Sequence, residues 1–369
     1  MIAFEGVTKI YNGTPAVRDL DLVAPTGKLT VLVGPSGCGK TTSLRMVNRL
    51  IAPTSGTITL DGEPTHGMKV AQLRRRIGYV IQHAGLFPHR TVAQNVATTA
   101  RLAGIDRGRA RKIALELLER VGLPSALADR YPWQLSGGQQ QRVGVARALA
   151  SDPKFMLMDE PFSAVDPIVR ARLQDEFLRL QREIGKTIIM VTHDIDEALK
   201  LGDQVAVMRT GGKLAQVASP QALLTRPADS FVADFVGRDR GYRHLGFAGI
   251  DDDIVLSKEP AVLLGTPAEA AARSAIDGWV LVADEAGRPL GWVRVAELSG
   301  PVRESDLNLS STFASRGGTM RELLDAALSS PSGRGVVTED DGVLRGTIGL
   351  ADLVRTLDER RTSASGRGS

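Results

Sequence analysis

The chain of 369 residues has one cysteine, few aromatic side chains and no long apolar run. The single thiol, Cys38, cannot form an internal disulfide, and such scarcity fits a reducing compartment. No apolar stretch approaches the ~18–20 residues that cross a bilayer. The N-terminal residues, MIAFEGVTKIY, lack the basic and apolar regions of a secretory signal. We therefore expect a soluble, cytoplasmic chain that reaches a membrane only through a partner.

Charge is divided unevenly along the chain. Residues 241–369 hold 14 Lys and Arg against 19 Asp and Glu, a balance of −5, whereas residues 1–240 hold 32 against 23, a balance of +9. A basic region can face nucleic acid, anionic lipid or nucleotide phosphates. Aromatic residues make up only 4% of the chain, which disfavours the stacking used to bind single-stranded nucleic acid. We expect no nucleic-acid partner.

The first domain, predicted at 1–236, alternates β-rich apolar runs with longer segments of helical period. The apolar runs are Leu29–Val33, Phe155–Met158, Thr187–Val191 and Gln204–Met208. Because strands alternate with helices, we expect an α/β fold with a largely parallel sheet. A charged linker is predicted next, at 237–246.

A weak internal repeat lies beyond this linker. The segment VADEAGRPLGWVRVAEL at 282–298 aligns without gaps with VTEDDGVLRGTIGLADL at 337–353. Gly291 falls on Gly346, and a second aligned pair is Gly287 with Gly342. Each copy predicts two strands joined by a glycine-containing turn and followed by the start of a helix.

The repeat sets the predicted limits of a small α+β module. A helix precedes the strands of each copy, and Thr266 and Thr319 are candidate N-caps for these helices. One copy alone buries little surface, so we expect two copies, 247–300 and 301–357, to pair. The polar residues 358–369 are expected to be disordered.

Residues 34–42, GPSGCGKTT, match the phosphate-binding pattern GxxxxGK[ST]. The match follows an apolar strand and precedes a helical segment, so glycines can turn backbone N–H groups towards phosphates at a helix N-terminus. Lys40 supplies a cation to the γ-phosphate, and Thr41 offers a hydroxyl to Mg²⁺. Candidate ATP-binding residues are therefore Gly34, Pro35, Ser36, Gly37, Cys38, Gly39, Lys40, Thr41 and Thr42.

Two carboxylates follow the apolar run FMLM at 155–158. Asp159, at a strand end beside the phosphate loop, can hold Mg²⁺ directly or through water. Glu160 points differently and can act as general base for the attacking water. An Asp-Glu pair after apolar residues is common by chance, so this interpretation depends on the motifs around it.

The segment LSGGQQQR at 135–142 resembles the signature of ABC-type ATPases, and it lies between the phosphate loop and the Asp-Glu pair. The resemblance covers residues 1 to about 235 of the chain. It implies that two copies of the chain form a homodimer in which each ATP is held by the phosphate loop of one copy and the signature of the other. The trans contacts implied are Ser136, Gly137, Gly138 and Gln139.

Smaller markers follow in the order typical of this family. By resemblance, Tyr11 stacks on adenine, Gln82 reaches Mg²⁺ and the attacking water, and His193 contacts the γ-phosphate. Asp166, in the segment SAVD, matches the loop that crosses the dimer interface. Trp133, just before the signature, is a local departure that takes no part in phosphate chemistry.

One uninterrupted ATPase domain with a C-terminal appendage resembles the ATPase of an importer. This resemblance implies separate permease subunits, an indirect link to a solute-binding protein, and a peripheral place on the cytoplasmic face of the plasma membrane. The permease contact is expected in the segment HAGLFPHRTVAQNV at 83–96, where Leu86-Phe87-Pro88 could seat a short helix.

The repeated module resembles paired CBS domains. An ABC ATPase followed by such a pair resembles the quaternary-amine importers, which take up glycine betaine, choline or carnitine. An importer of an amino acid or another small solute, or an ABC switch without a transport role, remains an alternative. CBS pairs often bind adenosine through Ser or Thr and a nearby Asp, but here the equivalent positions are Arg294 with Glu297 and Gly349 with Asp352. We expect a regulatory tail whose signal is undefined.

Overall fold

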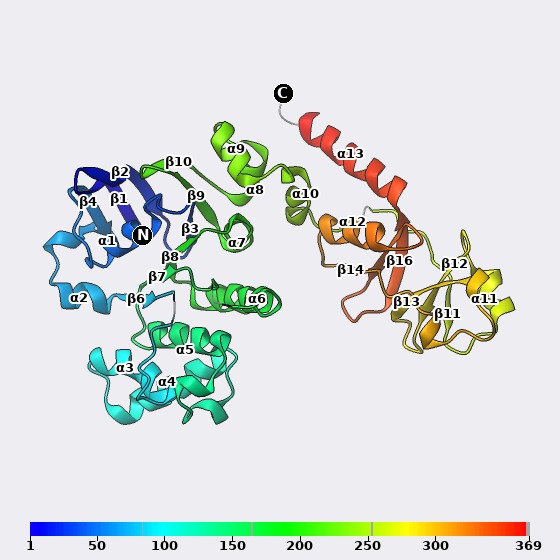
Figure 1. Ribbon diagram of the computed structural model, residues 1–369, viewed down its shortest axis with the longest axis horizontal. Coiled ribbons are helices and arrows are strands. Elements are labelled where there is room, and N and C mark those ends of the chain that lie inside the picture. Colours follow the sequence, from blue (N-terminus) through cyan, green and yellow to red (C-terminus); the bar gives the residue numbers. More distant parts are fainter. Residues whose placement is uncertain (83, 164, 252–253, 367–369) are drawn as a thin grey trace. The chain divides into compact units, whose positions relative to one another are not determined.

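The computed structural model describes residues 1–82, 84–163, 165–251 and 254–366 of the chain. The chain divides into two compact units between Arg238 and Asp239 (Figure 1). Within the described ranges, no helix is long and apolar enough to cross a membrane. The α/β fold predicted for the first domain is confirmed, and the division lies within the predicted linker.

The first unit is built on a six-stranded sheet with the order β10-β9-β3-β8-β7-β6. All its neighbouring strands are parallel except β10, which pairs with β9 in the antiparallel sense. The strands are β3 (Leu29–Val33), β6 (Ile77–Val80), β7 (Phe155–Asp159), β8 (Thr187–Thr192), β9 (Gln204–Arg209) and β10 (Lys213–Ala218). The four predicted apolar runs are therefore strands of this sheet.

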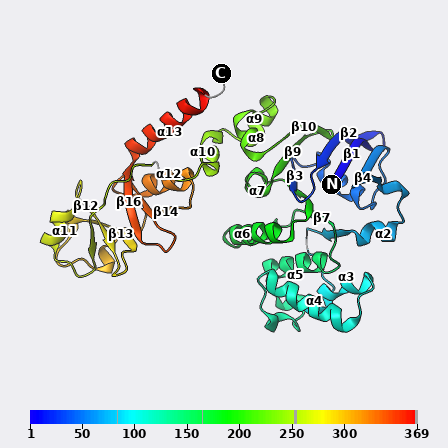
Figure 2. The same ribbon diagram turned by 180° about the vertical axis from the view of Figure 1, so that it is seen from behind.

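The apolar runs are continuous because both faces of this sheet are covered. In β3, for example, Val31 belongs to one hydrophobic core and its neighbour Leu32 to the other. The first core contains residues of four long helices that lie together in Figures 1 and 2. These helices are α3 (Val92–Leu102), α4 (Arg107–Arg120), α5 (Gly137–Leu149) and α6 (Pro167–Ile184).

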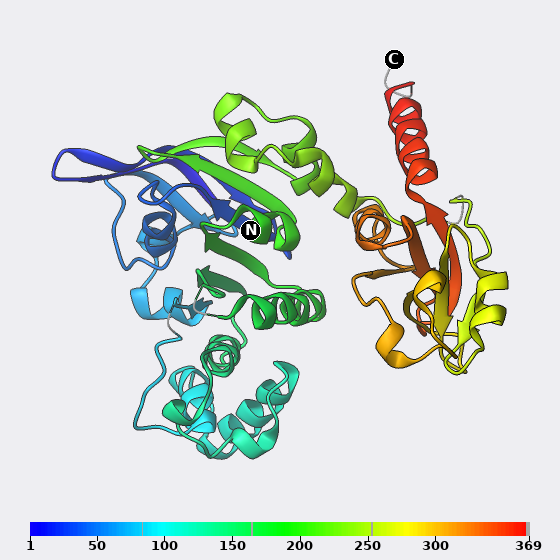
Figure 3. The same ribbon diagram turned by 45° about the vertical axis from the view of Figure 1, so that its right-hand side comes forward.

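The second core joins the other face of the sheet to helix α1 (Lys40–Val47) and to an antiparallel sheet with the order β2-β1-β4-β5. The tip of the β1–β2 hairpin projects from this sheet (Figure 3). Its strands are β1 (Ile2–Tyr11), β2 (Thr14–Ala24), β4 (Ser55–Leu60) and β5 (Glu63–Pro64). The remaining helices of this unit include α2 (Val70–Arg75), α7 (Ile195–Leu201), α8 (Pro220–Thr225) and α9 (Ser230–Val236).

The second unit contains two three-stranded sheets of the same design in its described part. In each, a short strand pairs in parallel with a second strand, which pairs in the antiparallel sense with a third. The first copy comprises β11 (Ala261–Leu263), α11 (Ala268–Ser274), β12 (Trp279–Ala283) and β13 (Pro289–Arg294). The second comprises β14 (Phe313–Ser315), α12 (Met320–Ser329), β15 (Arg334–Thr338), β16 (Leu344–Gly349) and α13 (Leu350–Gly366).

Only one of the two predicted threonine caps is present. Thr319 caps α12 with its hydroxyl, and Glu322 bonds back to the backbone of Thr319 in a capping box. The prediction for Thr266 is wrong, because α11 begins after Pro267 without a side-chain cap. The carbonyl of Thr266 instead accepts a hydrogen bond from the backbone of Val302.

The two copies exchange the segments that precede their strands, so the predicted limits 247–300 and 301–357 do not separate them. Ser257 lies before the first copy but pairs with Thr347 of the second. Asn308 lies before the second copy but pairs with Trp292 of the first. In the same way, Ile254 belongs to the hydrophobic core of the second copy. The exchange joins the copies into one module.

Two other boundary predictions are wrong. Residues 239–246 are not a free linker, since α10 (Arg240–His244) lies in the second unit and Tyr242 Oη donates a hydrogen bond to Asp325 of α12. The tail predicted as disordered from 358 is helical as far as Gly366. Its Leu, Arg, Glu and Ala residues favour helix, and no Gly or Pro interrupts α13 before its last residue.

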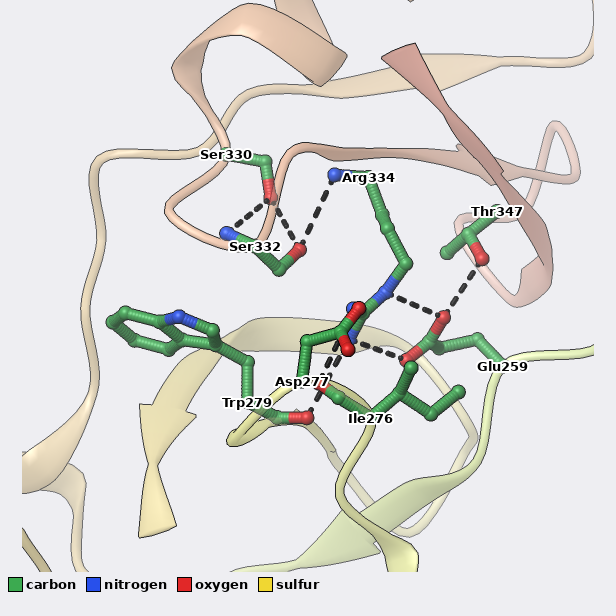
Figure 4. Close-up of polar contacts among 8 residues, drawn as sticks. All are labelled: Glu259, Ile276, Asp277, Trp279, Ser330, Ser332, Arg334 and Thr347. Carbon is green, nitrogen blue, oxygen red and sulfur yellow. Dashed lines mark hydrogen bonds and ion pairs between the residues drawn. The ribbon is translucent and has the colours of Figure 1, made fainter. Parts of the chain in front are cut away.

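A buried ion pair links the copies of the second unit (Figure 4). Nε and Nη2 of Arg334 each lie 3.1 Å from a carboxylate oxygen of Glu259, and the two side chains are 11% and 2% exposed. Thr347 Oγ1 donates to the same carboxylate at 2.8 Å. The guanidinium also donates to the carbonyls of Ile276 and Trp279 in the first copy. Every oxygen of this buried carboxylate therefore has a donor.

Candidate functional site

The candidate site lies at one edge of the six-stranded sheet. Strands β3, β8, β7 and β6 are parallel neighbours, so their carboxyl ends meet at this edge. The loop after β3 is GPSGCGKTT, the Asp-Glu pair ends β7, His193 follows β8 and Gln82 follows β6. Ligands of open α/β sheets bind outside the carboxyl ends of the strands. The topology thus brings four separate motifs to one place.

Two glycines of the loop are required by close approaches of the backbone. A Cβ on Gly34 would lie 2.2 Å from the carbonyl oxygen of Met208, and one on Gly39 would lie 2.2 Å from that of Ala16. Gly39 also has a φ of +97° and forms the N-cap of α1. Side chains larger than hydrogen therefore cannot occupy these positions without displacing a strand.

Lys40 lies inside the loop rather than on its surface. The residue is only 7% exposed, and its Nζ donates to the carbonyls of Gly34 at 2.7 Å and Pro35 at 3.0 Å. Cys38 is buried beside it, with Sγ 3.6 Å from the ammonium, and fills space in the adjoining core. The positive charge is thereby fixed within the ring of backbone groups that the sequence assigns to phosphate.

Thr41 and Asp159 are brought together from sequence positions 118 residues apart. Thr41 Oγ1 donates to Asp159 Oδ1 at 2.9 Å. Burial raises the pKa of Asp159 above its ordinary value, and the hydrogen bond from Thr41 opposes this shift. A hydroxyl and one carboxylate, completed by phosphate oxygens and water, are a donor set that suits Mg²⁺. The residues present therefore fit the metal that the sequence analysis expects.

Glu160 stands between the two other polar candidates. Its Oε2 lies 3.1 Å from His193 Nδ1 and accepts a hydrogen bond from Gln82 Nε2 at 3.3 Å. The backbone of Glu160 has a φ of +46°, which is unusual for a residue with a side chain. Its N–H donates to the carbonyl of Val191 in β8, which holds this conformation. Strain of this kind collects at functional sites.

A pocket of about 330 Å³ connects the phosphate loop to Glu160 and His193. Its lining includes three of the residues predicted as candidates for ATP binding, Ser36, Gly37 and Thr42. Ala16 of β2 also lines the pocket and was not predicted, because an alanine carries no chemical signal in the sequence. The complete lining is Ala16, Ser36, Gly37, Gly39, Lys40, Thr41, Thr42, Glu160 and His193.

Tyr11 does not line this pocket. It ends β1 at the hairpin, its side chain is exposed, and the ammonium of Lys9 lies 5.0 Å from the centre of its ring. A stacking role for Tyr11 towards adenine therefore stays a prediction.

The signature residues form the N-terminus of α5 and lie outside the pocket lining. Ser136 is the N-cap, and its side chain and that of Gln139 bond reciprocally to each other's backbone N–H. Gly137 is exposed, and a Cβ on Gly138 would meet three apolar side chains at ordinary contact distances. The positive end of a 13-residue helix is thus available to an anion that this chain's own phosphate loop does not hold.

Asp166 immediately precedes α6 and is exposed. Its carbonyl accepts a hydrogen bond from the backbone of Arg170 at 2.7 Å, which fixes the start of the helix. Ala164, in the same SAVD segment, lies outside the described residues. An interface role for Asp166 stays a prediction.

Replacing Lys40 with alanine is expected to weaken ATP binding about 10- to 100-fold. The estimate follows from loss of one charge-assisted hydrogen bond, worth ~1.5–3 kcal/mol. Equilibrium binding of a fluorescent ATP analogue checks it, with the exposed Lys69→Ala as control. Unchanged affinity in the Lys40 variant would show that the ammonium does not contact the nucleotide.

Comparisons with known proteins identify the family of the chain. The family model described as "ABC transporter" matches residues 17–163. The osmoprotectant import ATP-binding protein OsmV of Salmonella typhimurium is 47% identical, over 80% of this chain and 80% of that protein. The glycine betaine/carnitine transport ATP-binding protein GbuA of Listeria monocytogenes is 38% identical, over 95% and 90%.

Among solved structures, the ATP-binding cassette MJ0796, a dimer in a post-hydrolysis state with ADP and Pi, is similar with a TM-score of 0.54. It is 32% identical, and the match covers 60% of this chain and 99% of that one. The match to GbuA, over 95% of the chain, includes residues of both units. The chain belongs to the ATP-binding subunits of ABC transporters, a family of ATP hydrolases.

Proposed function

We propose that this chain hydrolyses ATP to drive import of a quaternary-amine compatible solute such as glycine betaine, choline or carnitine. ATP hydrolysis is supported by one observation: Lys40, Thr41, Glu160 and His193 all line the same pocket. The solute class rests on the names of relatives, because GbuA resembles the chain over 95% of its length. An amino-acid importer is the alternative.

In the proposed reaction, Lys40 and the backbone N–H groups of the loop bind the β- and γ-phosphates. Glu160 accepts a proton from the attacking water, and His193, 3.1 Å from that carboxylate, orients it and contacts the γ-phosphate. Gln82, hydrogen-bonded to Glu160 at 3.3 Å, adds a second orienting contact. Thr41 and Asp159, with Gln82 as the third predicted ligand, would hold Mg²⁺, which would neutralise charge on the phosphates.

The proposed active form is a homodimer. The free N-terminus of α5, with Ser136, Gly137, Gly138 and Gln139, would meet the γ-phosphate held by the partner copy. The exposed Asp166 lies at the proposed interface. Each ATP is then complete only between two chains, so binding closes the dimer and hydrolysis opens it.

The segment 84–96 is proposed to receive the permease; His83, the first residue of the predicted contact, lies outside the described residues. Phe87 is 39% exposed, although the loop around it is fixed. Fully buried Asn95 accepts from the N–H of Phe87 at 2.7 Å and donates to the carbonyls of Phe87, Arg90 and Thr91. An exposed aromatic side chain on a rigid loop suits docking. The chain would then sit peripherally on the cytoplasmic face of the plasma membrane.

The second unit is proposed to be a pair of CBS domains that regulates transport. Its two β-α-β-β copies and their exchanged leading segments support this assignment. The positions that would bind ribose offer little to a nucleotide, because Arg294 pairs with Glu297 at 3.4 Å and the other copy has Gly349. We expect a condition-dependent inhibition that removal of residues 239–369 relieves.

Uptake by the transporter reconstituted in vesicles with its permease subunits and solute-binding protein tests the proposal. We expect ATP-dependent accumulation of radiolabelled betaine, choline or carnitine, and none with the Lys40→Ala chain. Accumulation of amino acids alone would favour the alternative. Failure of the purified chain to bind these permease subunits would support an ABC switch without a transport role.

A further inference from the structure

A second pocket, of about 300 Å³, lies on the surface of the helical layer formed by α3 and α4. Its floor includes the buried Ala93 and Ala97, which lie one turn apart on α3. Four guanidinium groups line it, and no carboxylate does. The four are Arg90, Arg101, Arg107 and Arg111.

Two of these arginines are held in place by their surroundings. Arg90 Nη1 donates to Thr98 at 2.8 Å, and its guanidinium lies 4.8 Å from the centre of the Phe87 ring. Arg111 forms an exposed ion pair with Asp129 at 3.1 Å. The other two, Arg101 and Arg107, are exposed and have no ion-pair partner among the residues that the structure describes.

The start of α4 breaks a local rule in a way that fits an anion. A helix N-terminus favours acidic residues, yet the first turn of α4 has none and contains Arg107 and Arg109. The side-chain carboxylate of the N-cap Asp106 accepts a hydrogen bond from the N–H of Arg109. Positive residues at the positive end of a helix destabilise it, and such local conflicts mark functional positions. Arg107 of this first turn lines the pocket, so the start of α4 adds positive charge to it.

We propose that this arginine pocket binds carboxylate side chains of the permease segment that docks on residues 84–96. The inference rests on the proposed function and names the chemistry of its partner. Arg90 belongs to both surfaces, so the pocket continues the docking loop that Asn95 fixes. Carboxylate and phosphate both accept paired hydrogen bonds from guanidinium groups, but only a glutamate also has an apolar stem to cover Ala93 and Ala97.

The test uses an Arg101→Glu/Arg107→Glu chain in the reconstituted transporter. The two changes have opposite effects on helix stability, since one places an acid in the last turn of α3 and the other in the first turn of α4. Arg179→Glu/Arg182→Glu on α6 is the matched control, because both residues are exposed and have the same change in charge. Thermal unfolding of each isolated chain shows whether it is folded, and Arg101→Gln/Arg107→Gln provides a milder variant.

We expect the affinity for the detergent-solubilised permease to fall about tenfold or more in the glutamate variant, less in the glutamine variant, and not in the control. A lysine substituted for one acidic residue in a cytoplasmic loop of the permease should restore binding of the glutamate variant. Unchanged affinity in a folded variant would overturn the inference while leaving uptake by the wild type, and thus the proposed function, intact. Binding of each variant to phosphatidylglycerol vesicles is measured as well. If the glutamate variant loses binding to these vesicles but not to the permease, the pocket binds lipid, and the inference is overturned.

Discussion

Replacing Glu160 with glutamine is expected to lower ATP hydrolysis about 10²- to 10⁴-fold, the usual range for loss of a general base. The amide keeps the shape of the side chain and its contacts with Gln82 and His193, but it cannot accept a proton from water. ATP affinity should stay unchanged, because the phosphate loop and Lys40 are untouched. Phosphate release measured with saturating ATP gives the rate.

The matched control is Glu183→Gln, which removes an exposed carboxylate of the same unit that pairs weakly with Arg120 at 3.6 Å. Its hydrolysis rate should equal that of the wild type. Hydrolysis at the normal rate in the Glu160 variant would show that another group activates the water. An equal loss of hydrolysis rate in both variants would indicate damage to the fold rather than to the chemistry.

Replacing Arg334 with methionine is expected to destabilise the second unit by ~3–5 kcal/mol, because it leaves the charge of Glu259 buried without a cation. The same change removes the guanidinium that lies 4.7 Å from the centre of the buried Trp292 ring. The first unit is a separate compact unit and should keep its ATPase activity. Hydrogen bonds to Ile276 and Trp279 are lost as well, so the two copies should separate more easily.

Urea unfolding followed by tryptophan fluorescence measures this effect. The three tryptophans are Trp133 in the first unit and Trp279 and Trp292 in the second, so a Trp133→Phe background makes the signal specific. The control Arg294→Met breaks an exposed pair and should cost ~0–1 kcal/mol. The double variant Arg334→Met/Glu259→Leu should be more stable than Arg334→Met alone, since no charge is left buried. An equal loss of stability in Arg334→Met and in the double variant would contradict the ion-pair explanation.

The motifs of the ATP site could be predicted because they are local. GPSGCGKTT between a strand and a helix and LSGGQ at a helix start are readable within ten residues of sequence. The order β3-β8-β7-β6 could not be read in this way, because each parallel pair joins strands that are far apart in the chain. The direct contact of Glu160 with both Gln82 and His193 depends on that order.

The glycines of the tail repeat acquire a physical reason only in the structure. A Cβ on Gly291 would lie 2.9 Å from the carbonyl oxygen of Asn308, and one on Gly346 would lie 2.8 Å from that of Ser257. Asn308 and Ser257 belong to the exchanged segments, each of which pairs with the third strand of the opposite copy. The sequence repeat marked both glycines, but an exchange between copies leaves no periodic signal. The limits of the copies were therefore predicted wrongly.

The proposal that two chains share each ATP is tested most directly by the mass of the protein in solution with ATP and Mg²⁺. We predict that the Glu160→Gln chain doubles its mass when ATP is added. Adding Ser136→Arg should abolish this ATP-dependent change while the single chain still binds ATP, because Ser136 does not line its own chain's pocket. ATP-dependent doubling of the mass that survives Ser136→Arg would contradict the shared site.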